Sequence, residues 1–374
     1  MANKTARLGD LATYINGYAF KPADWGDTGL PIIRIQDLNG NSYQLNRYDG
    51  EYPERIEVND GDVLISWSAS LGVYVWQRGK ALLNQHIFKV VFDKLPVNKE
   101  YFVFAVEHKL AEMESKTHGA TMKHIVKKDF DGTTIPYPPI EKQAEIADHL
   151  RRITSLIDRQ AEQLLLLDQL VKSRFIELFG DYDLTHPQES WATIKEVGTV
   201  VGGATPKTDH DEYWGGSYRW ITPAELDADS GYIYDSVRKL TKAGVESCSL
   251  QEMPVGTVIL SSRAPIGKVA IAGNTFYCNQ GFKNIICKEG ITPRYLYTVL
   301  LLNVEYLNSL GRGATFKEIS KGIVESIRIP VPSMELQEQF AAFVEQTDKS
   351  KLAVQKGLQE LEILKKSLMQ QYFG

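Results

Sequence analysis

The strongest constraint on this chain is that part of its sequence occurs twice. Residues 119–180 and 313–374 align at a constant offset of 194 positions: GATMKHI returns as GATFKEI, IPYPPIEKQ returns as IPVPSMELQ, and both copies end in Phe-Gly. A chain that contains one unit twice can fold into two similar domains related by an internal twofold axis. A protein with this internal symmetry suits a target that itself has two similar halves.

The repeat extends, with lower similarity, into the regions before each copy. GDVLISWSASLGVYV from Gly61 aligns with GTVILSSRAPIGKVA from Gly256, and IIRIQDL from Ile32 resembles WITPAEL from Trp220. The framework residues of these stretches agree, while the residues between them differ. We therefore predict that the two halves share a scaffold and differ in their loops.

The first copy reads as a mixed domain followed by a long helix. Residues 1–138 contain a helical stretch near 101–114 and short strand-like runs between Gly, Pro, Asn and Asp turns, the runs being 63–66, 73–76 and 86–92. Residues 139–180 then place apolar side chains at helical 3–4 spacing. Pro138-Pro139 and Gly180 are the start and stop signals of that helix.

The second copy repeats this order, with a mixed domain at 181–331 and a helix at 332–374. Its apolar seam is weaker, because three seam positions are polar and Gly357 lies inside the helix. The predicted fold class is α+β, with two similar mixed α/β domains separated by two long helices. These helices are expected to pack as an antiparallel coiled coil, with a pseudo-twofold axis through its middle.

The long helices have two interpretations. A helix of roughly 36 residues is about 54 Å long, which would hold two end domains roughly one and a half turns of B-DNA apart. The same pair could instead be a strut between domains or a dimerisation device, and periodicity does not separate these alternatives. Leu164, Leu165, Leu166 and Leu167 make the first helix apolar on all sides, which indicates a further docked partner.

Composition narrows the class of protein. The chain has 374 residues and 43% hydrophobic residues, with no signal peptide recognised and no apolar run near the ~18 residues that span a bilayer. The expectation is a cytoplasmic protein without a membrane partner. Cys248, Cys278 and Cys287 occur only in the second copy, so we interpret them as reduced packing residues. A net charge of −5 predicts that any nucleic-acid contact uses a local basic patch.

Catalytic motifs are not recognised. The stretch 202–208 ends in Lys-Thr like a phosphate-binding loop, but Pro206 stands where the second glycine is needed. No metalloprotease, paired-cysteine, nucleophile-elbow or amino-methyltransferase motif occurs. His108, His118 and His124 are not kept in the second copy, so surface histidines are the simpler interpretation. We predict no catalytic residue, no metal and no cofactor of its own.

A basic stretch recurs in both copies. Each contains Gly-Ala-Thr, one variable residue and Lys, in which glycine permits close approach, threonine offers a hydroxyl and lysine offers a cation for DNA phosphates. A turn that starts a helix is the alternative interpretation. The candidate DNA-binding residues here are Lys116, Thr121, Lys123 and Lys127 in the first copy, and Arg312, Thr315, Lys317 and Lys321 in the second.

A second candidate DNA-binding element is the aligned pair of loops after Gly61 and Gly256. The loops keep their framework and vary the residues between, as two readers of different base sequences should. Neutral drift after duplication explains the variation equally well. The candidate contacts are Trp67, Ser68 and Ser70 in one loop and Ser262 and Arg263 in the other, where Arg263 could pair with a guanine edge.

Taken together, these residues resemble a known family. The Pro-x-x-Glu-x-Gln pattern before each long helix, the Phe-Gly ends, and WITPAEL, IGKVAI and NQGFKNII are similar to the specificity (S) subunit of type I restriction-modification systems. The first half departs from the sequences that are usual in this family, because it has IIRIQDL, LGVYVW and NQHIFKVV at the corresponding places. The resemblance covers essentially the whole chain.

The resemblance implies two target-recognition domains, each of which reads one half of a bipartite double-stranded DNA sequence. It further implies that the helices set the half-site spacing and dock two adenine methyltransferase (M) subunits, to which restriction/translocase (R) subunits can add. In that family the S subunit is not an enzyme, and S-adenosylmethionine belongs to the methyltransferase. Two alternatives stay open: a coiled-coil interaction scaffold without DNA readout, and a divergent nuclease or methyltransferase.

Overall fold

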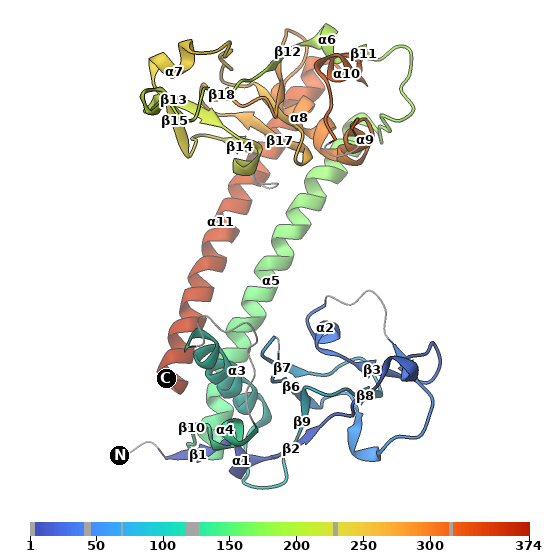
Figure 1. The fold of residues 1–374 in the computed structure, drawn as a ribbon, viewed down its shortest axis with the longest axis vertical. Coiled ribbons are helices and arrows are strands. Elements are labelled where there is room, and N and C mark those ends of the chain that lie inside the picture. Colours follow the sequence, from blue (N-terminus) through green and yellow to red (C-terminus); the bar gives the residue numbers. More distant parts are fainter. Residues whose placement is uncertain (1–3, 41–45, 69, 117–126, 227–230, 314–316) are drawn as a thin grey trace. The chain divides into compact units, whose positions relative to one another are not determined.

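The chain divides into two units, each of which holds one mixed domain and parts of both long helices. The computed structural model describes residues 4–40, 46–68, 70–116, 127–226, 231–313 and 317–374, with the backbone alone at 114–116. Unit 1 is Met1–Glu162 with Gln355–Gly374, and unit 2 is Gln163–Val354. The four consecutive pieces expected from the sequence describe the order along the chain, whereas each compact unit combines a domain with the start of one helix and the end of the other (Figure 1).

The two long helices form where their start and stop signals place them. Helix α5 runs from Ile140 to Phe179 and helix α11 from Met334 to Phe373. Gly180 ends α5 in the left-handed conformation, with φ of 88°, and its N–H donates to the carbonyl of Ile176 at 2.8 Å. Both predicted helices are confirmed to within two residues at each end.

Unit 1 contains two four-stranded sheets and a short two-stranded ribbon. The strand-like runs predicted at 63–66, 73–76 and 86–92 are confirmed as β6, β7 and β9. The strands are β1 (Thr5–Arg7), β2 (Thr13–Asn16), β3 (Leu30–Ile33), β4 (Arg47–Tyr48), β5 (Glu57–Val58), β6 (Val63–Ser66), β7 (Gly72–Val75), β8 (Ala81–Leu83), β9 (Ile87–Val91) and β10 (Thr134–Pro136). The shorter helices are α1 (Leu8–Leu11), η1 (Pro22–Asp24), α2 (Ile35–Leu38), η2 (Glu54–Ile56), α3 (Lys99–Lys116) and α4 (Lys127–Gly132).

Unit 2 has a similar set of elements, with one five-stranded sheet, one three-stranded sheet and a two-stranded ribbon among its described residues. Its strands are β11 (Ala192–Thr193), β12 (Gly198–Gly202), β13 (Trp214–Ile221), β14 (Tyr232–Ile233), β15 (Arg238–Leu240), β16 (Val258–Ser262), β17 (Ile266–Ala272), β18 (Tyr277–Cys278), β19 (Lys283–Cys287) and β20 (Arg328–Ile329). Its shorter helices are α6 (Ile194–Val197), η3 (Asp211–Tyr213), η4 (Pro223–Glu225), α7 (Lys242–Glu246), α8 (Pro293–Leu302), α9 (Val304–Ser309) and α10 (Lys321–Ser326).

The strand order confirms that the two domains share one scaffold. The sheet β2-β9-β6-β7 of unit 1 corresponds to β12-β19-β16-β17 of unit 2, which adds β14 at its edge. The second sheet also matches, because β3 pairs parallel with β8 and antiparallel with β4, as β13 does with β18 and β15. The ribbons β1-β10 and β11-β20 complete the correspondence. Two halves with little sequence identity outside the repeat thus fold alike.

A buried glutamine fastens each domain to the start of its helix. In unit 1, Gln143 accepts from the backbone N–H of Asn98 at 2.9 Å and donates to the carbonyl of Pro138 at 2.9 Å. In unit 2, Gln337 accepts from the N–H of Thr292 at 2.8 Å and donates to the carbonyl of Pro332 at 2.9 Å. We call each of these glutamines, together with its hydrogen bonds to the domain, the glutamine latch of its unit. It explains why the Gln of the repeated Pro-x-x-Glu-x-Gln pattern is present in both copies.

The far end of each helix completes the other core. In unit 1 the ring of Phe373 lies 5.2 Å from that of Tyr101, and in unit 2 the ring of Phe179 lies 4.9 Å from that of Tyr295. Both tyrosine hydroxyls donate to proline carbonyls before the helix, at 2.8 and 2.9 Å. Burial raises the pKa of both hydroxyls, so they stay neutral donors. Within each unit, therefore, the start of one helix packs antiparallel to the end of the other.

The weaker seam of α11 has a structural reason. Lys351 forms an ion pair with Asp168, and Thr347 is buried with its hydroxyl donating to the carbonyl of Phe343 at 3.0 Å. Lys365 lies 3.7 Å from Glu107. Gly357 lies against the amide of Gln160, which a Cβ at residue 357 would approach to 3.0 Å. Polar seam residues here make specific contacts in place of apolar packing.

Candidate nucleic-acid interface

The two aligned loops are held by the same hydrogen bond. Ser66 at the end of β6 donates its hydroxyl to the carbonyl of Ser70 at 2.6 Å, and Ser261 near the end of β16 donates to the carbonyl of Pro265 at 2.7 Å. Both serines are fully buried. A buried hydroxyl that bonds across a loop fixes the loop's path, because leaving the donor unpaired costs about 1–3 kcal/mol. The common framework expected from the sequence is therefore seen as the same serine hydrogen bond in both loops.

In unit 2 the structure brings together the loop at Arg263 and the repeated basic stretch. Arg263 forms a β-bridge with Glu318, and the N–H of Ile319 donates to the carbonyl of Ser262 at 3.0 Å. Arg312 also pairs with Glu318 through backbone hydrogen bonds of 3.1 and 3.0 Å. The two candidate elements, which are about fifty residues apart in sequence, are therefore one surface in this unit.

The side chains of this surface divide into exposed and buried ones. Arg312, Lys317 and Lys321 are exposed, and Arg263 is partly exposed. Ser262 is fully buried, and its hydroxyl lies 3.3 Å from the Nζ of Lys283. The Ser262 side chain thus faces the interior, and its direct contact with a base stays a prediction that this buried position does not favour.

In unit 1 the corresponding loop has aromatic chemistry. Trp67 occupies the place of Ser262 and stacks on Phe88, with ring centroids 5.5 Å apart and planes inclined by 20°. Phe88 in turn occupies the place of Lys283 in the aligned strand. Ser68 and Ser70 are half-buried, and the N–H of Ser70 donates to the carbonyl of Ser68 at 2.8 Å. The same scaffold thus presents an aromatic stack in one unit and ionic groups in the other.

The basic stretch of unit 1 is described only in part. Thr121 and Lys123 lie outside the described residues, as do Thr315 in unit 2 and the side chain of Lys116, the last residue of α3. Lys127 begins α4, pairs with Asp131 at 2.8 Å and lies 5.8 Å from the ring centre of Tyr14. The roles of these residues in DNA binding stay predictions.

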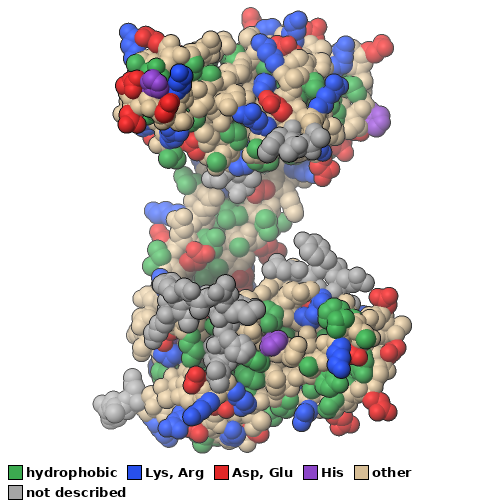
Figure 2. Space-filling view, viewed as in Figure 1, with side chains coloured by type: hydrophobic (Ala, Val, Ile, Leu, Met, Phe, Trp, Pro, Cys, Tyr) green, Lys and Arg blue, Asp and Glu red, His purple; other side chains and the backbone are tan. Residues whose placement is uncertain are grey.

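Two of the candidate lysines have neighbouring carboxylates on their own helices. Lys127 pairs with Asp131, and Lys321 lies 3.7 Å from Glu325. Both pairs are exposed i,i+4 pairs, which contribute only about 0.3–0.5 kcal/mol, so a phosphate can replace the carboxylate at small cost. On the face drawn in Figure 2, Lys and Arg are interspersed with Asp and Glu over both units, in keeping with the net charge of −5.

Sequence reasoning missed two residues at the Arg263 surface. Lys283 donates to the carboxylate of Glu318 at 3.0 Å, and only 13% of its side chain is exposed. Glu318 interrupts the basic stretch in sequence, whereas in the structure it is the centre of an ionic cluster with Lys283 and Arg263. The signal was available in the alignment, since the first unit has Phe88 where the second has Lys283.

The four consecutive leucines lie on the part of α5 that belongs to unit 2. Leu165 is 64% exposed and Leu166 is 55% exposed, while Leu164 and Leu167 are half-buried. Leu170 and, on α11, Leu352 add further exposed apolar surface, at 47% and 69%. A helix needs only one apolar stripe to pack against its neighbour, so these exposed leucines exceed what that packing requires.

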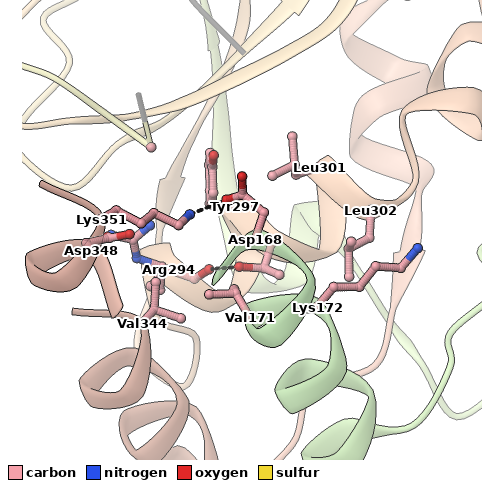
Figure 3. Close-up of a pocket in the computed structure, with 12 residues that line it drawn as sticks. Asp168, Val171, Lys172, Arg294, Tyr297, Leu301, Leu302, Val344, Asp348 and Lys351 are labelled. Atoms are coloured by element: carbon pink, nitrogen blue, oxygen red, sulfur yellow. Dashed lines mark hydrogen bonds and ion pairs between the residues drawn. The ribbon is translucent and has the colours of Figure 1, made fainter. Parts of the chain in front are cut away.

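Where α8 meets the two helices in unit 2, charged residues form the joint drawn in Figure 3. Asp168 and Lys172 project from α5, Arg294 from α8, and Asp348 and Lys351 from α11. Arg294 is 8% exposed and binds Asp348 at 3.0 Å. The hollow at this joint has a volume of about 220 Å³. Four of these five charged residues form two ion pairs, Arg294 with Asp348 and Lys351 with Asp168, which favours a structural joint over a ligand site.

In the equivalent joint of unit 1, the acidic and basic partners of the ion pair are exchanged between the domain and the helix. There the domain supplies the acid, Glu100 on α3, and the helix supplies the base, Arg151 on α5, with Nε and Oε2 3.6 Å apart. In unit 2 the domain supplies Arg294 and the helix supplies Asp348. The two junctions share the glutamine latch and differ in the direction of this ion pair.

Other classes of site find little support in the described part of the chain. No group of three or more His, Cys, Asp or Glu residues that could hold a metal ion occurs among the residues that the structure describes. Within the same residues, no helix has the length and apolar character needed to cross a membrane. Burial raises the pKa of Cys278 and of Cys287 to about 12, so neither thiol ionises readily.

Comparison with known proteins places both halves of the chain in one family. The family model described as "Type I restriction modification DNA specificity domain" matches residues 2–166 and again residues 188–363. The MjaIX specificity subunit of a type I restriction enzyme from Methanocaldococcus jannaschii is 42% identical over 185 residues, which are 48% of this chain and 43% of that protein. This chain therefore spans less than half the length of that relative.

Two further comparisons extend over the whole chain. The MjaVIII specificity subunit from the same organism is 24% identical over 396 residues, covering 98% of this chain and 91% of that protein. The crystal structure of a type I restriction-modification S subunit from M. genitalium superposes with a TM-score of 0.56 at 15% identity, covering 99% of this chain and 96% of that one. At this identity the structural likeness shows the fold.

Proposed function

We propose a function from one premise: this chain belongs to the family of proteins built from the type I restriction modification DNA specificity domain. We infer that it is the non-catalytic subunit that gives a type I restriction-modification complex its DNA sequence specificity. Each domain would read one half of a bipartite DNA target. The long helices would set the half-site spacing and dock two adenine methyltransferase subunits, to which restriction subunits can add.

The observation that carries this proposal is the duplicated scaffold with different loop chemistry. Both units have the same strand order and the same serine hydrogen bond across the loop. In and beside the loop, unit 1 has Trp67 stacked on Phe88, whereas unit 2 has Ser262 and Lys283 at those positions, and Arg263 in the place of Ser68. A scaffold that serves only to join proteins has no need of such different groups at equivalent places, whereas two readers of different base sequences do.

The exposed leucines support the docking of partner subunits. Leu165, Leu166 and Leu170 are 64%, 55% and 47% exposed on one helix. Contiguous apolar surface of this kind marks protein interaction sites. The catalytic steps and their S-adenosylmethionine would belong to the methyltransferase partner.

The decisive experiment maps methylated adenines across the genome of cells that express the methyltransferase with or without this chain. We expect a bipartite motif that is present only when the chain is present. Methylation that does not depend on the chain, or a chain that co-purifies with partners but shows no preference among DNA sequences, would instead indicate an interaction scaffold.

A second experiment tests the assignment of one half-site to each domain. Residues 1–138 are exchanged for the corresponding domain of another family member, with Gln143 and Gln337 left in place so that Gln143 can bind the backbone of the new domain. We expect one half of the methylated motif to change and the other half and the spacing to stay the same. A change in both halves would contradict the model of two independent readers.

A further inference from the structure

An ionic cluster lies at the tip of the unit 2 scaffold, in the surface formed by the Arg263 loop and the basic stretch. Glu318 is its centre: its Oε1 lies 3.0 Å from the Nζ of Lys283, and its Oε2 lies 3.9 Å from Nη1 of Arg263. Lys283 is 13% exposed, while Arg263 and Glu318 are 35% and 40% exposed. We call these three residues the Arg263 cluster.

The cluster contains more positive charge than its own packing requires. Lys283 alone is enough to balance Glu318, and it approaches from the buried side, where it also lies 3.3 Å from the Ser262 hydroxyl. Arg263 is a second cation at the solvent side of the same carboxylate. Among the residues that the structure describes, its guanidinium has no other ion pair and donates no hydrogen bond within 3.5 Å. Most of its donors therefore remain available to a ligand.

The path of Arg263 is constrained by its surroundings. A Cβ added at Gly281 would lie 3.5 Å from the Nε of Arg263, which is van der Waals distance, so the arginine side chain passes beside Gly281. The backbone of Arg263 is bridged to that of Glu318. An arginine fixed at its backbone, passing beside a glycine and facing a carboxylate on one side presents its remaining N–H groups in a restricted orientation.

A hollow of about 620 Å³ opens beside the cluster. Ala264, Pro265 and Ile266 form an apolar wall, and Lys317 stands at the same hollow with its side chain exposed. This combination matches the edge of a base pair in the DNA major groove. Paired donors of arginine recognise O6 and N7 of guanine, a glutamate oxygen accepts from N4 of cytosine, and a lysine at the rim suits a backbone phosphate.

We propose that the Arg263 cluster reads one G·C base pair in the half-site bound by unit 2. Arg263 donates to O6 and N7 of the guanine, and Glu318 orients Arg263 and accepts from N4 of the paired cytosine. Lys283 neutralises Glu318 from below, so that the carboxylate does not repel the DNA. This inference rests on the proposed function, and it assigns to unit 1, which has Ser68 in the place of Arg263 and Phe88 in the place of Lys283, a readout without this contact.

The test measures sequence preference at single positions. The full chain is assembled with its methyltransferase, and bound duplexes are selected from a library with random bases in both half-sites. With the unchanged chain we expect a G·C pair in the unit 2 half-site. Arg263→Ala should reduce the preference for that pair about 10- to 100-fold and leave the other half-site unchanged.

Two further variants separate readout from charge and folding. Arg263→Lys keeps the charge without the planar fork, so it should retain overall affinity while losing most of the preference for guanine. Arg219→Ala is the matched control, because Arg219 is 34% exposed in the same unit and pairs at 3.1 Å with Asp235, which is not a residue of the cluster. It should change neither affinity nor preference. Melting curves verify that each variant is folded.

The outcomes distinguish this inference from the proposed function. A complex that selects no motif at all would contradict the proposed function itself. A bipartite motif with no G·C pair in the unit 2 half-site, or a motif that Arg263→Ala leaves unchanged, would overturn the Arg263 assignment alone. A shift in the half-site read by unit 1 would likewise refute it.

Discussion

The glutamine latch allows a quantitative prediction about stability. Gln337 is fully buried and makes three hydrogen bonds through its amide: it accepts from the N–H of Thr292 and donates to the carbonyls of Gly290 and Pro332 at 3.0 and 2.9 Å. Gln337→Ala removes all three. At about 1 kcal/mol of net stability for each hydrogen bond, the variant should lose about 3 kcal/mol.

The equivalent change in unit 1 is an internal comparison. The Gln143 amide makes two hydrogen bonds of this kind, to Asn98 and Pro138, so Gln143→Ala should lose about 2 kcal/mol. The expected difference between the two variants is therefore about 1 kcal/mol. Alanine gains a few tenths of a kcal/mol in helix propensity over glutamine in both cases, so this term cancels in the comparison.

The assay must follow the two units separately, because a chain with two compact units need not unfold in one step. Equilibrium urea unfolding gives the free energy, and amide hydrogen exchange reports the start of α8 and of α3. Gln339→Ala is the matched control, since Gln339 is exposed on the same helix two residues away and should change stability by less than about 0.5 kcal/mol. The reasoning fails if Gln337→Ala behaves like this control, or if Gln143→Ala is the more damaging change.

Further predictions concern the helices and the basic stretch. Lys317→Ala should weaken binding to every duplex and reduce the slope of log K against log salt by about 0.9, and an unchanged slope would remove its phosphate contact. Leu165→Ser and Leu166→Ser should leave the melting curve unchanged but weaken co-purification with the methyltransferase; equal co-purification would contradict docking at these leucines. Phe373→Ala should cost about 3–5 kcal/mol and lower exchange protection in unit 1. Loss of protection confined to unit 2 would contradict the packing of this ring.

Much of the fold was predictable because the sequence contains the same structural unit twice. The repeat at an offset of 194 made each half a check on the other, and prolines, acidic first turns and Gly180 marked the ends of the long helices. Alternating apolar runs located β6, β7 and β9. What the pattern could not supply was the grouping into units, because a helix seam does not show that Phe373 completes the core containing Tyr101.

The candidate interface was only partly predictable for a related reason. Arg263 and Lys317 were recognised as cations in loops that vary, which is a property of sequence. Ser262 lies next to Arg263 in the same loop, yet its side chain is fully buried, and that burial depends on the tertiary fold. Glu318 interrupts the basic stretch in sequence, but in the structure its carboxylate lies 3.0 Å from the Nζ of Lys283. Charge patterns along the chain do not reveal which charges meet.

The junctions described above also bear on how such a chain can change through recombination. Both junctions have the glutamine latch, so a domain inherited from a different lineage finds the attachment it needs. The ion pairs have opposite polarity, so a domain carrying Arg294 would meet Arg151 if it were grafted at the first junction. Under the proposed function, replacing either domain with one of matching polarity would give the chain a new target in one step. Exchanging the two domains of one chain with each other would place Arg294 near Arg151 and Glu100 near Asp348. Repulsion between these like charges disfavours the exchange.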